Sequence, residues 1–243
     1  MVESIKELRK ICQSSEKRRM RFADFRAPMC RAMSIYITKI CLYTSLTANQ
    51  ITYIWWAMGL VSAGLFAVGD YWYSLAAALL LNLSFLVDYV DGEVARYRKK
   101  SSLLGVYLDY LAHYTINPLV MLGIGFGAFI NNPFPLIPDY AYLLAGAITG
   151  IFMLNVNLVK TKKYEIFIDK GELKRVEAQR KVYKSKQEGG VVKFVLGFLR
   201  MSFFNIIPIA AVFDFLHFMI LFYAVFLPLM YLSRAYAEIK SLD

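Results

Sequence analysis

The 243-residue sequence has few cysteines and histidines, and several common catalytic motifs are missing. Its three cysteines, Cys12, Cys30 and Cys41, have spacings that fit no zinc motif and imply no disulfide framework. The sequence contains no G-x-x-x-x-G-K-[ST] loop, no G-x-S-x-G turn and no heptad array. The first fifty residues lack the apolar core of a cleavable signal. None of these familiar patterns therefore explains the chain.

Apolar residues dominate what is present. Hydrophobic residues make up 58% of the chain and aromatic residues 16%, and the mean hydropathy is +0.45, which exceeds the usual range of a soluble domain of this length. A helix needs about 20 apolar residues to cross a bilayer. The sequence therefore predicts an all-α integral membrane protein whose six transmembrane helices cover residues 50–68, 71–91, 103–130, 139–159, 191–213 and 215–233.

A different pattern precedes these spans. Residues 1–22 are charged and contain no run long enough to cross a membrane, whereas residues 24–47 have an amphipathic helical pattern. We expect the second segment to lie in the membrane interface, although a soluble helix that faces a partner would fit the same pattern. We thus divide the chain into an N-terminal region, 1–46, and a transmembrane domain, 47–243. The apolar side of the predicted helix carries Met29, Met33, Tyr36, Ile37, Ile40 and Tyr43.

Positive charge is confined to one side of this predicted topology. All 28 Lys and Arg fall in the N-terminal region, in residues 96–100, in residues 160–200 or in the C-terminal tail. The opposite side carries only Asp70, Asp139 and Asp214. The positive-inside rule then places both termini on the cytoplasmic side of the membrane. That membrane would be the plasma membrane of a prokaryote or the endoplasmic reticulum of a eukaryote. The net charge of +10 indicates topology and attraction to anionic membrane lipids, not to nucleic acid.

Residues 88–113 place ionisable side chains at the ends of two apolar segments, where such groups are costly and usually functional. At 3.6 residues per turn, Asp88 and Asp91 share one stripe of a helix with Gly92 and Ala95. A second stripe, on the following helix, carries Gly105, Asp109 and His113. Converging carboxylates suit hard divalent cations, and residues without bulky side chains leave room for a ligand. The spacing predicts metal-dependent phosphate chemistry on the cytoplasmic side.

These residues resemble the signature of the CDP-alcohol phosphatidyltransferases, D-x2-D-G-x2-A-R-x8-G-x3-D-x3-D. Seven of its eight fixed positions match, and His113 replaces the last aspartate. Residues 46–52, LTANQIT, also resemble the family's L-T-P-N-x-(V/I)-T segment, with Ala48 in place of proline. An alternative is that Thr47 is only the N-cap of the next helix. The resemblance further implies a homodimer.

The resemblance implies attack of an alcohol hydroxyl on the β-phosphorus of a CDP-linked donor, most simply CDP-diacylglycerol, with release of CMP. Asp88, Asp91 and Asp109 would hold Mg²⁺ or Mn²⁺, and His113 would deprotonate the polar alcohol acceptor. His113 could equally be a metal ligand or a mark of lost activity. The residues implied for binding the nucleotide and donor are Asn49, Thr52, Asp88, Gly92, Ala95, Arg96 and Gly105.

Other interpretations stay open at this point. Arg200 would bind a phosphate of the acceptor or extend to the membrane interface. The basic insertion 160–193 would cover the site or touch lipid headgroups, and His217 would pack in the last span. A catalytically silent membrane scaffold, a phosphotransferase acting on a lipid hydroxyl and a cation transporter are the alternative functions. The transporter fits least, because its carboxylates would be expected near the bilayer midplane.

Overall fold

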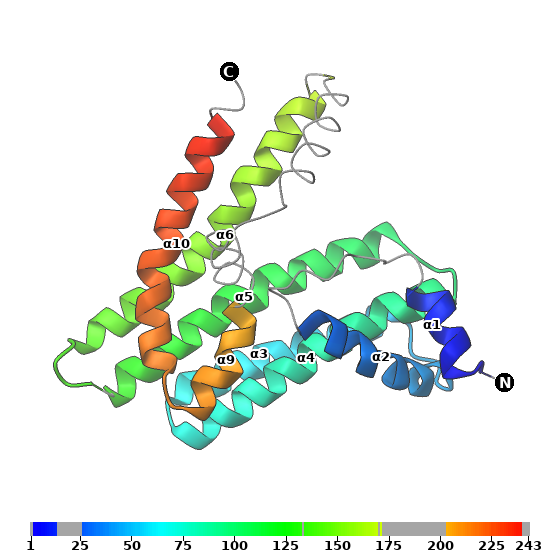
Figure 1. Cartoon of the computed structure of the whole chain (residues 1–243), viewed down its shortest axis with the longest axis horizontal. Helices are drawn as coiled ribbons and strands as arrows, with labels where there is room; N and C mark the ends of the chain where they lie inside the picture. The colour runs from blue at the N-terminus through cyan, green and yellow to red at the C-terminus, as the bar shows by residue number, and fades with distance from the viewer. Residues whose placement is uncertain (1, 14–25, 133, 170, 172–202, 240–243) are drawn as a thin grey trace.

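The computed structural model describes residues 2–13, 26–132, 134–169, 171 and 203–239. These residues form helices and turns without strands, so the predicted all-α fold is confirmed (Figure 1). In chain order the eight helices of the described residues are α1 (Ile5–Gln13), α2 (Arg26–Leu42), α3 (Ala48–Val68), α4 (Tyr71–Tyr97), α5 (Leu103–Asn131), α6 (Asp139–Asp169), α9 (Phe203–Val212) and α10 (Leu216–Ile239).

Five of the described helices are long and apolar enough to cross a membrane: α3, α4, α5, α10 and the Asp139–Val156 part of α6. This finding agrees with an integral membrane protein. The predicted span 191–213 lies largely outside the described residues, which include only α9 at its end. The described residues therefore support five spans and do not confirm a count of six.

Local capping explains where the long helices begin and end. Thr47 caps α3 through a reciprocal capping box with Gln50, which confirms its predicted N-cap role. The helix ends at Val68, and its C-cap Gly69 has a φ of 78°, which suits a residue without Cβ. Asp70 then accepts two backbone N–H groups at the start of α4. After α5, Asn132 adopts a φ of 35° at the predicted break between spans.

The helices pack closely because small residues lie where they cross. Helix α3 contacts both α4 and α5, and α6 lies between α5 and α10. A Cβ at Gly123 would collide with the carbonyl oxygen of Ala63, and one at Gly127 with that of Phe66. Such close backbone approach is typical of membrane helices, whose association relies on van der Waals contact. The crossing of α3 and α5 brings the N-terminal part of α3 beside the site described below.

The N-terminal region is more structured than its charged sequence suggested. We predicted only a polar segment for residues 1–22, but α1 forms there and packs against α2 and α4. Its first turn has a capping box between Ser4 and Glu7. Leu8 and Cys12 are fully buried in a small cluster with Ile35 of α2. The prediction failed because the apolar side of this short helix contains few residues.

Helix α2 confirms the predicted helix over much of residues 24–47 and shows which side faces the protein. Its apolar side chains Met29, Met33, Tyr36 and Ile40 are exposed, whereas Ser34 and Thr38 are fully buried. A helix with apolar residues on its outer side and polar residues on its inner side suits a membrane interface. In Figure 1, α1 and α2 lie beside one end of α4.

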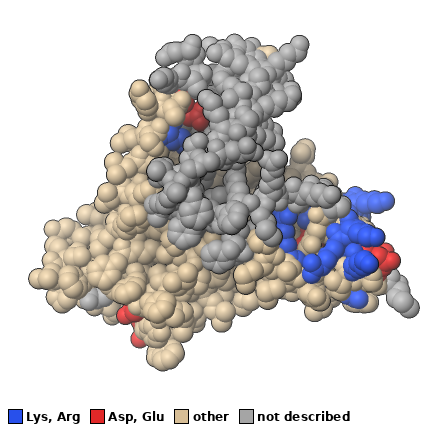
Figure 2. All heavy atoms as spheres, in the orientation of Figure 1, with Lys and Arg blue, Asp and Glu red and all other residues tan. Residues whose placement is uncertain are grey.

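Three long helices extend beyond their predicted ends. Helix α4 continues to Tyr97 instead of ending at Asp91, α6 continues to Asp169 instead of Val159, and α10 continues to Ile239 instead of Ser233. The basic insertion 160–193 therefore begins as a helix, and its remainder lies outside the described residues apart from Gly171. Figure 2 shows Lys and Arg side chains gathered at the end of the molecule where α1 and α2 lie.

Candidate active site

Helices α4 and α5 bring two predicted carboxylates and the predicted imidazole together. Nε2 of His113 lies 3.6 Å from Oδ1 of Asp88 and 3.5 Å from Oδ1 of Asp109. One ligand atom from each residue lies within 4.8 Å of the others. The side chains of His113, Asp88 and Asp109 are 32%, 21% and 42% exposed, so the cluster is open to a ligand.

Helical spacing accounts for this arrangement. Asp109 and His113 are four residues apart and therefore lie on the same side of α5. Ser102 fixes the start of α5, because its Oγ accepts the backbone N–H of Gly105 at 3.0 Å. Asp88 comes from the facing side of α4. The two predicted stripes therefore converge at Asp88, Asp109 and His113.

Asp91 occupies a separate position beside this cluster. Its Oδ2 accepts a hydrogen bond from Thr52 Oγ1 at 2.7 Å and from Trp55 Nε1 at 2.9 Å. Asp91 does not belong to the group of described residues that could hold a metal ion, whose ligand atoms lie within 4.8 Å of one another. Thr52, predicted to bind the nucleotide, therefore bonds a carboxylate of the signature. Both donors belong to α3, so these two hydrogen bonds connect α3 to the site.

Two aromatic rings hold the imidazole. The ring centroid of Trp55 lies 5.0 Å from that of His113, and the ring of Phe85 stacks on His113 with centroids 6.2 Å apart and planes 16° from parallel. Trp55 is fully buried and Phe85 is nearly so. These contacts restrict the ring of His113 while its Nε2 faces the two carboxylates.

The glycines of the signature lie beside polar side chains. A Cβ added to Gly105 would lie 3.1 Å from Oδ1 of Asn49, so these two predicted site residues are neighbours. A Cβ added to Gly92 would lie 3.2 Å from Nη1 of Arg96. The guanidinium of Arg96 thus covers the Gly92 surface. Ala95 is partly exposed on the next turn, and Arg200 lies outside the described residues.

Sequence reasoning missed Glu93 and Trp55. Glu93 occupies a variable position of the signature, yet it is only 1% exposed. Its oxygens accept hydrogen bonds from Ser34 Oγ at 2.7 Å and Thr38 Oγ1 at 2.6 Å. A signal was present, because Ser34 and Thr38 are four residues apart on α2 and mark a polar stripe. Trp55 had no comparable signal in an apolar span.

The donor set of the cluster fits a divalent cation. Carboxylate oxygens are preferred ligands of hard cations, and Mn²⁺ also accepts imidazole nitrogen. Asp88, Asp109 and His113 supply two oxygens and one nitrogen from partly exposed side chains. The same Nε2 can instead accept a proton, since imidazole is a common general base. The cluster can therefore support metal-dependent or acid–base chemistry.

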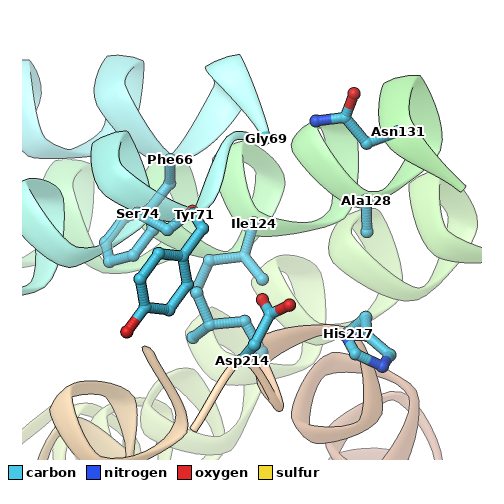
Figure 3. Close-up of a pocket in the computed structure, with 10 residues that line it drawn as sticks. Phe66, Gly69, Tyr71, Ser74, Ile124, Ala128, Asn131, Asp214 and His217 are labelled. Atoms are coloured by element: carbon cyan, nitrogen blue, oxygen red, sulfur yellow. The ribbon is translucent and has the colours of Figure 1, made fainter. Parts of the chain in front are cut away.

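A cavity of about 150 Å³ lies at the other end of α3 and α5. Figure 3 shows Asp214 between Tyr71 and His217 at this cavity, and Gly69 lies in the same lining. No residue of the signature lines it. His217 packs against Phe218 with ring centroids 4.2 Å apart, as predicted for a histidine packed in the last span. We therefore do not assign the chemistry to this cavity.

The sequence matches the model of a known protein family. The family model of the CDP-alcohol phosphatidyltransferases matches residues 45–232, well over half of the chain. No curated protein matches the sequence. The matched region contains the carboxylates, the imidazole and the glycines described above, and the family comprises transferases of phospholipid biosynthesis. The chain belongs to the CDP-alcohol phosphatidyltransferase family.

Proposed function

We propose that the protein transfers a phosphatidyl group from CDP-diacylglycerol to the hydroxyl of a polar alcohol and releases CMP. The observation that carries this proposal is the approach of His113 Nε2 to the carboxylates of Asp88 and Asp109. A general base must lie beside groups that can organise the phosphates, and this cluster meets that requirement. The family match supports the reaction class.

In the proposed reaction, Nε2 of His113 accepts the proton of the acceptor hydroxyl. The hydroxyl oxygen forms a bond to the β-phosphorus of the donor, and the bond from that phosphorus to the oxygen bridging to CMP breaks. CMP leaves with the electron pair of that bond. The stacking of Phe85 and the contact with Trp55 support this role, because they fix the imidazole.

We assign Asp88, Asp91 and Asp109 to a divalent cation, Mg²⁺ or Mn²⁺. A bound cation supplies positive charge that offsets the negative charge of the pyrophosphate. The carboxylates of Asp88 and Asp109 face His113 directly, whereas that of Asp91 is held by Thr52 and Trp55. Those two hydrogen bonds fix the orientation of the Asp91 carboxylate, and its Oδ1 takes part in neither bond.

The nucleotide of the donor would bind along the small residues of α4 and α5. Gly92 and Ala95 contribute no long side chain of their own, and Gly105 lies beside Asn49. Arg96 lies over Gly92, where its guanidinium can meet a phosphate. Bulky side chains at either glycine would fill the proposed nucleotide surface. We assign Arg200 only to the phosphate of a charged acceptor, by resemblance.

We place this site at the cytoplasmic surface of the membrane. The distribution of Lys and Arg supports that orientation, since all of them fall on the side that carries residues 88–113 in the predicted topology. The outward-facing apolar residues of α2 support a position at the interface. A lipid donor and a water-soluble acceptor would meet at such a surface.

The test is the release of CMP by purified protein in lipid nanodiscs with Mg²⁺ or Mn²⁺. CDP-diacylglycerol is offered with a panel of polar alcohols, including serine, glycerol phosphate and inositol phosphate. CDP-choline and CDP-ethanolamine are offered with diacylglycerol in parallel. Acceptor-dependent CMP release from CDP-diacylglycerol is the expected result. Release from the CDP-alcohols alone would assign the lipid-hydroxyl reaction, and no release from any pair would favour the silent scaffold.

A further inference from the structure

Glu93 is a buried carboxylate at the centre of the signature. It is 1% exposed, and a carboxylate removed from water is costly unless its oxygens are bonded. Oε1 accepts from Gln13 Nε2 and from Ser34 Oγ, each at 2.7 Å, and Oε2 accepts from Thr38 Oγ1 at 2.6 Å. The three donors belong to α1 and α2. Glu93 therefore joins both N-terminal helices to α4.

Arg96 makes a second connection one turn further along α4. Its Nε donates to the backbone carbonyl of Cys12 on α1 at 2.6 Å. Its Nη1 is the atom that a Cβ on Gly92 would approach to 3.2 Å. A guanidinium bonded through Nε to a fixed carbonyl has little freedom to leave this position. The end of α1 therefore sets where the charge of Arg96 lies.

The neighbouring residues of α4 contact the same region. The hydroxyl of Tyr97 donates to the carboxylate of Glu3. Arg98 donates to the carbonyl oxygen of Leu46 at 2.6 Å and to that of Thr44 at 2.9 Å. Apart from Leu46, these partners precede residue 45, where the family match begins. The contacts thus attach a region outside the family match to the proposed nucleotide surface.

We propose that Glu93 is a positioning residue that holds α1 and α2 against α4 and thereby keeps Arg96 over Gly92, where the nucleotide of the donor binds. The role rests on the proposed function, because Gly92 and Arg96 are assigned to the donor there. Glu93 acts through Arg96 and does not touch the substrate. Its loss should weaken nucleotide binding more than the chemical step, since Asp88, Asp109 and His113 form a separate cluster.

The first measurement uses the thiol of Cys12. Burial raises the pKa of Cys12 to about 11, and its side chain is fully buried. In a Cys30→Ala/Cys41→Ala background, maleimide labelling of Cys12 at about pH 8 should be slow. Glu93→Ala removes the acceptor for three donors and should release α1. Labelling should then accelerate more than about a hundredfold, because an exposed thiol has a pKa near 8.5.

The second measurement is the affinity for CMP, determined by calorimetric titration, together with the kinetics of CMP release. Glu93→Ala should weaken CMP binding and raise KM for the donor about tenfold, the order expected when hydrogen bonds to a charged group are lost. The value of kcat should change less than about threefold. Asp139→Ala, which removes an exposed carboxylate at the start of α6, is the control and should leave all readouts unchanged.

Two further variants keep the test decisive if Glu93→Ala does not fold. Glu93→Gln has nearly the same shape and can bond all three partners, with its amide donating to the Thr38 hydroxyl. It should restore slow labelling and normal CMP affinity. Gln13→Ala removes one of the three bonds to Glu93, together with the bond from Gln13 to the carbonyl oxygen of Arg31, and should show intermediate changes. Accelerated labelling with unchanged CMP affinity would overturn the positioning role, and unchanged labelling in both alanine variants would overturn the attachment.

The outcomes separate this proposal from the proposed function. Wild-type protein that binds CMP but releases none from any donor would contradict the proposed reaction alone. In that case the role of Glu93 is still decided by labelling and CMP affinity. If wild-type protein neither binds nor releases CMP, both proposals are contradicted.

Discussion

The indole Nε1 of Trp55 donates a hydrogen bond to Oδ2 of Asp91 at 2.9 Å. The same ring lies 5.0 Å from the imidazole of His113. One buried side chain of α3 therefore orients a carboxylate of α4 and packs against the proposed base of α5. The three helices that form the site are connected through this residue.

Replacing Trp55 by phenylalanine should separate these two contacts. Phenylalanine keeps a ring against His113 but removes the hydrogen bond to Asp91, so CMP release should fall about tenfold or more. The rate at saturating Mg²⁺ measures the effect. The matched control is Trp56→Phe, because Trp56 Nε1 is buried without a hydrogen-bond partner among the described residues. Equal rates in the two variants would show that the bond to Asp91 is unimportant.

His113 stands where the family has its last aspartate, and its exchange tests the assigned base. His113→Ala should lose most activity at saturating metal, whereas His113→Asp should retain activity with a stronger preference for Mg²⁺, since an oxygen ligand replaces nitrogen. CMP release with each metal measures both effects. His217→Ala, at the far cavity, should leave the rate unchanged. A wild-type rate in His113→Ala would require another base.

The orientation of the protein can be tested with single cysteines in a background without the native ones. Leu136 is 84% exposed between α5 and α6, and Ser101 is exposed between α4 and α5. An impermeant maleimide added to intact cells should label Leu136→Cys and leave Ser101→Cys unlabelled, because the basic side faces the cytoplasm. The opposite pattern would invert the proposed topology.

The crossing of α3 and α5 predicts a difference between two glycines. A methyl group at Gly127 would collide with the carbonyl oxygen of Phe66, whereas nothing lies within 4 Å of one at Gly64. Gly127→Ala should lower the free energy of unfolding by about 1–3 kcal/mol through overpacking. Gly64→Ala should leave it unchanged or raise it, because alanine favours helix. Thermal unfolding in detergent measures both, and equal stability would contradict the described packing.

The long helices were predictable because their signals are local. The apolar runs of α3, α4 and α5 exceed the length of a bilayer, and Thr47, Gly69 and Asn132 mark ends through short-range capping. The segments by which α4, α6 and α10 extend beyond their predicted ends had no such signal. The turns that extend α4 to Tyr97 carry Glu93 and Arg96, whose side chains bond distant parts of the chain, and no apolar run predicts them.

The site could be predicted only in part for a similar reason. Helical spacing places Asp109 and His113 on one side of α5, and the signature indicates that Asp88 faces them. The partners of Glu93 lie 55 to 80 residues away in sequence. Such contacts depend on how α1 and α2 pack. A pattern within one segment contains no information about them.

The measurement that tests the central proposal most directly compares CMP release from CDP-diacylglycerol by the wild-type protein with that by Asp109→Asn. Asparagine keeps the shape of the side chain but removes the charge that a hard cation requires. We expect acceptor-dependent release by the wild type and a loss of about a hundredfold or more in the variant, as well as in Asp88→Asn and Asp91→Asn. Folding is checked by the thermal unfolding of each variant. No release by the wild type with any acceptor, or a wild-type rate in Asp109→Asn, would contradict the proposed reaction.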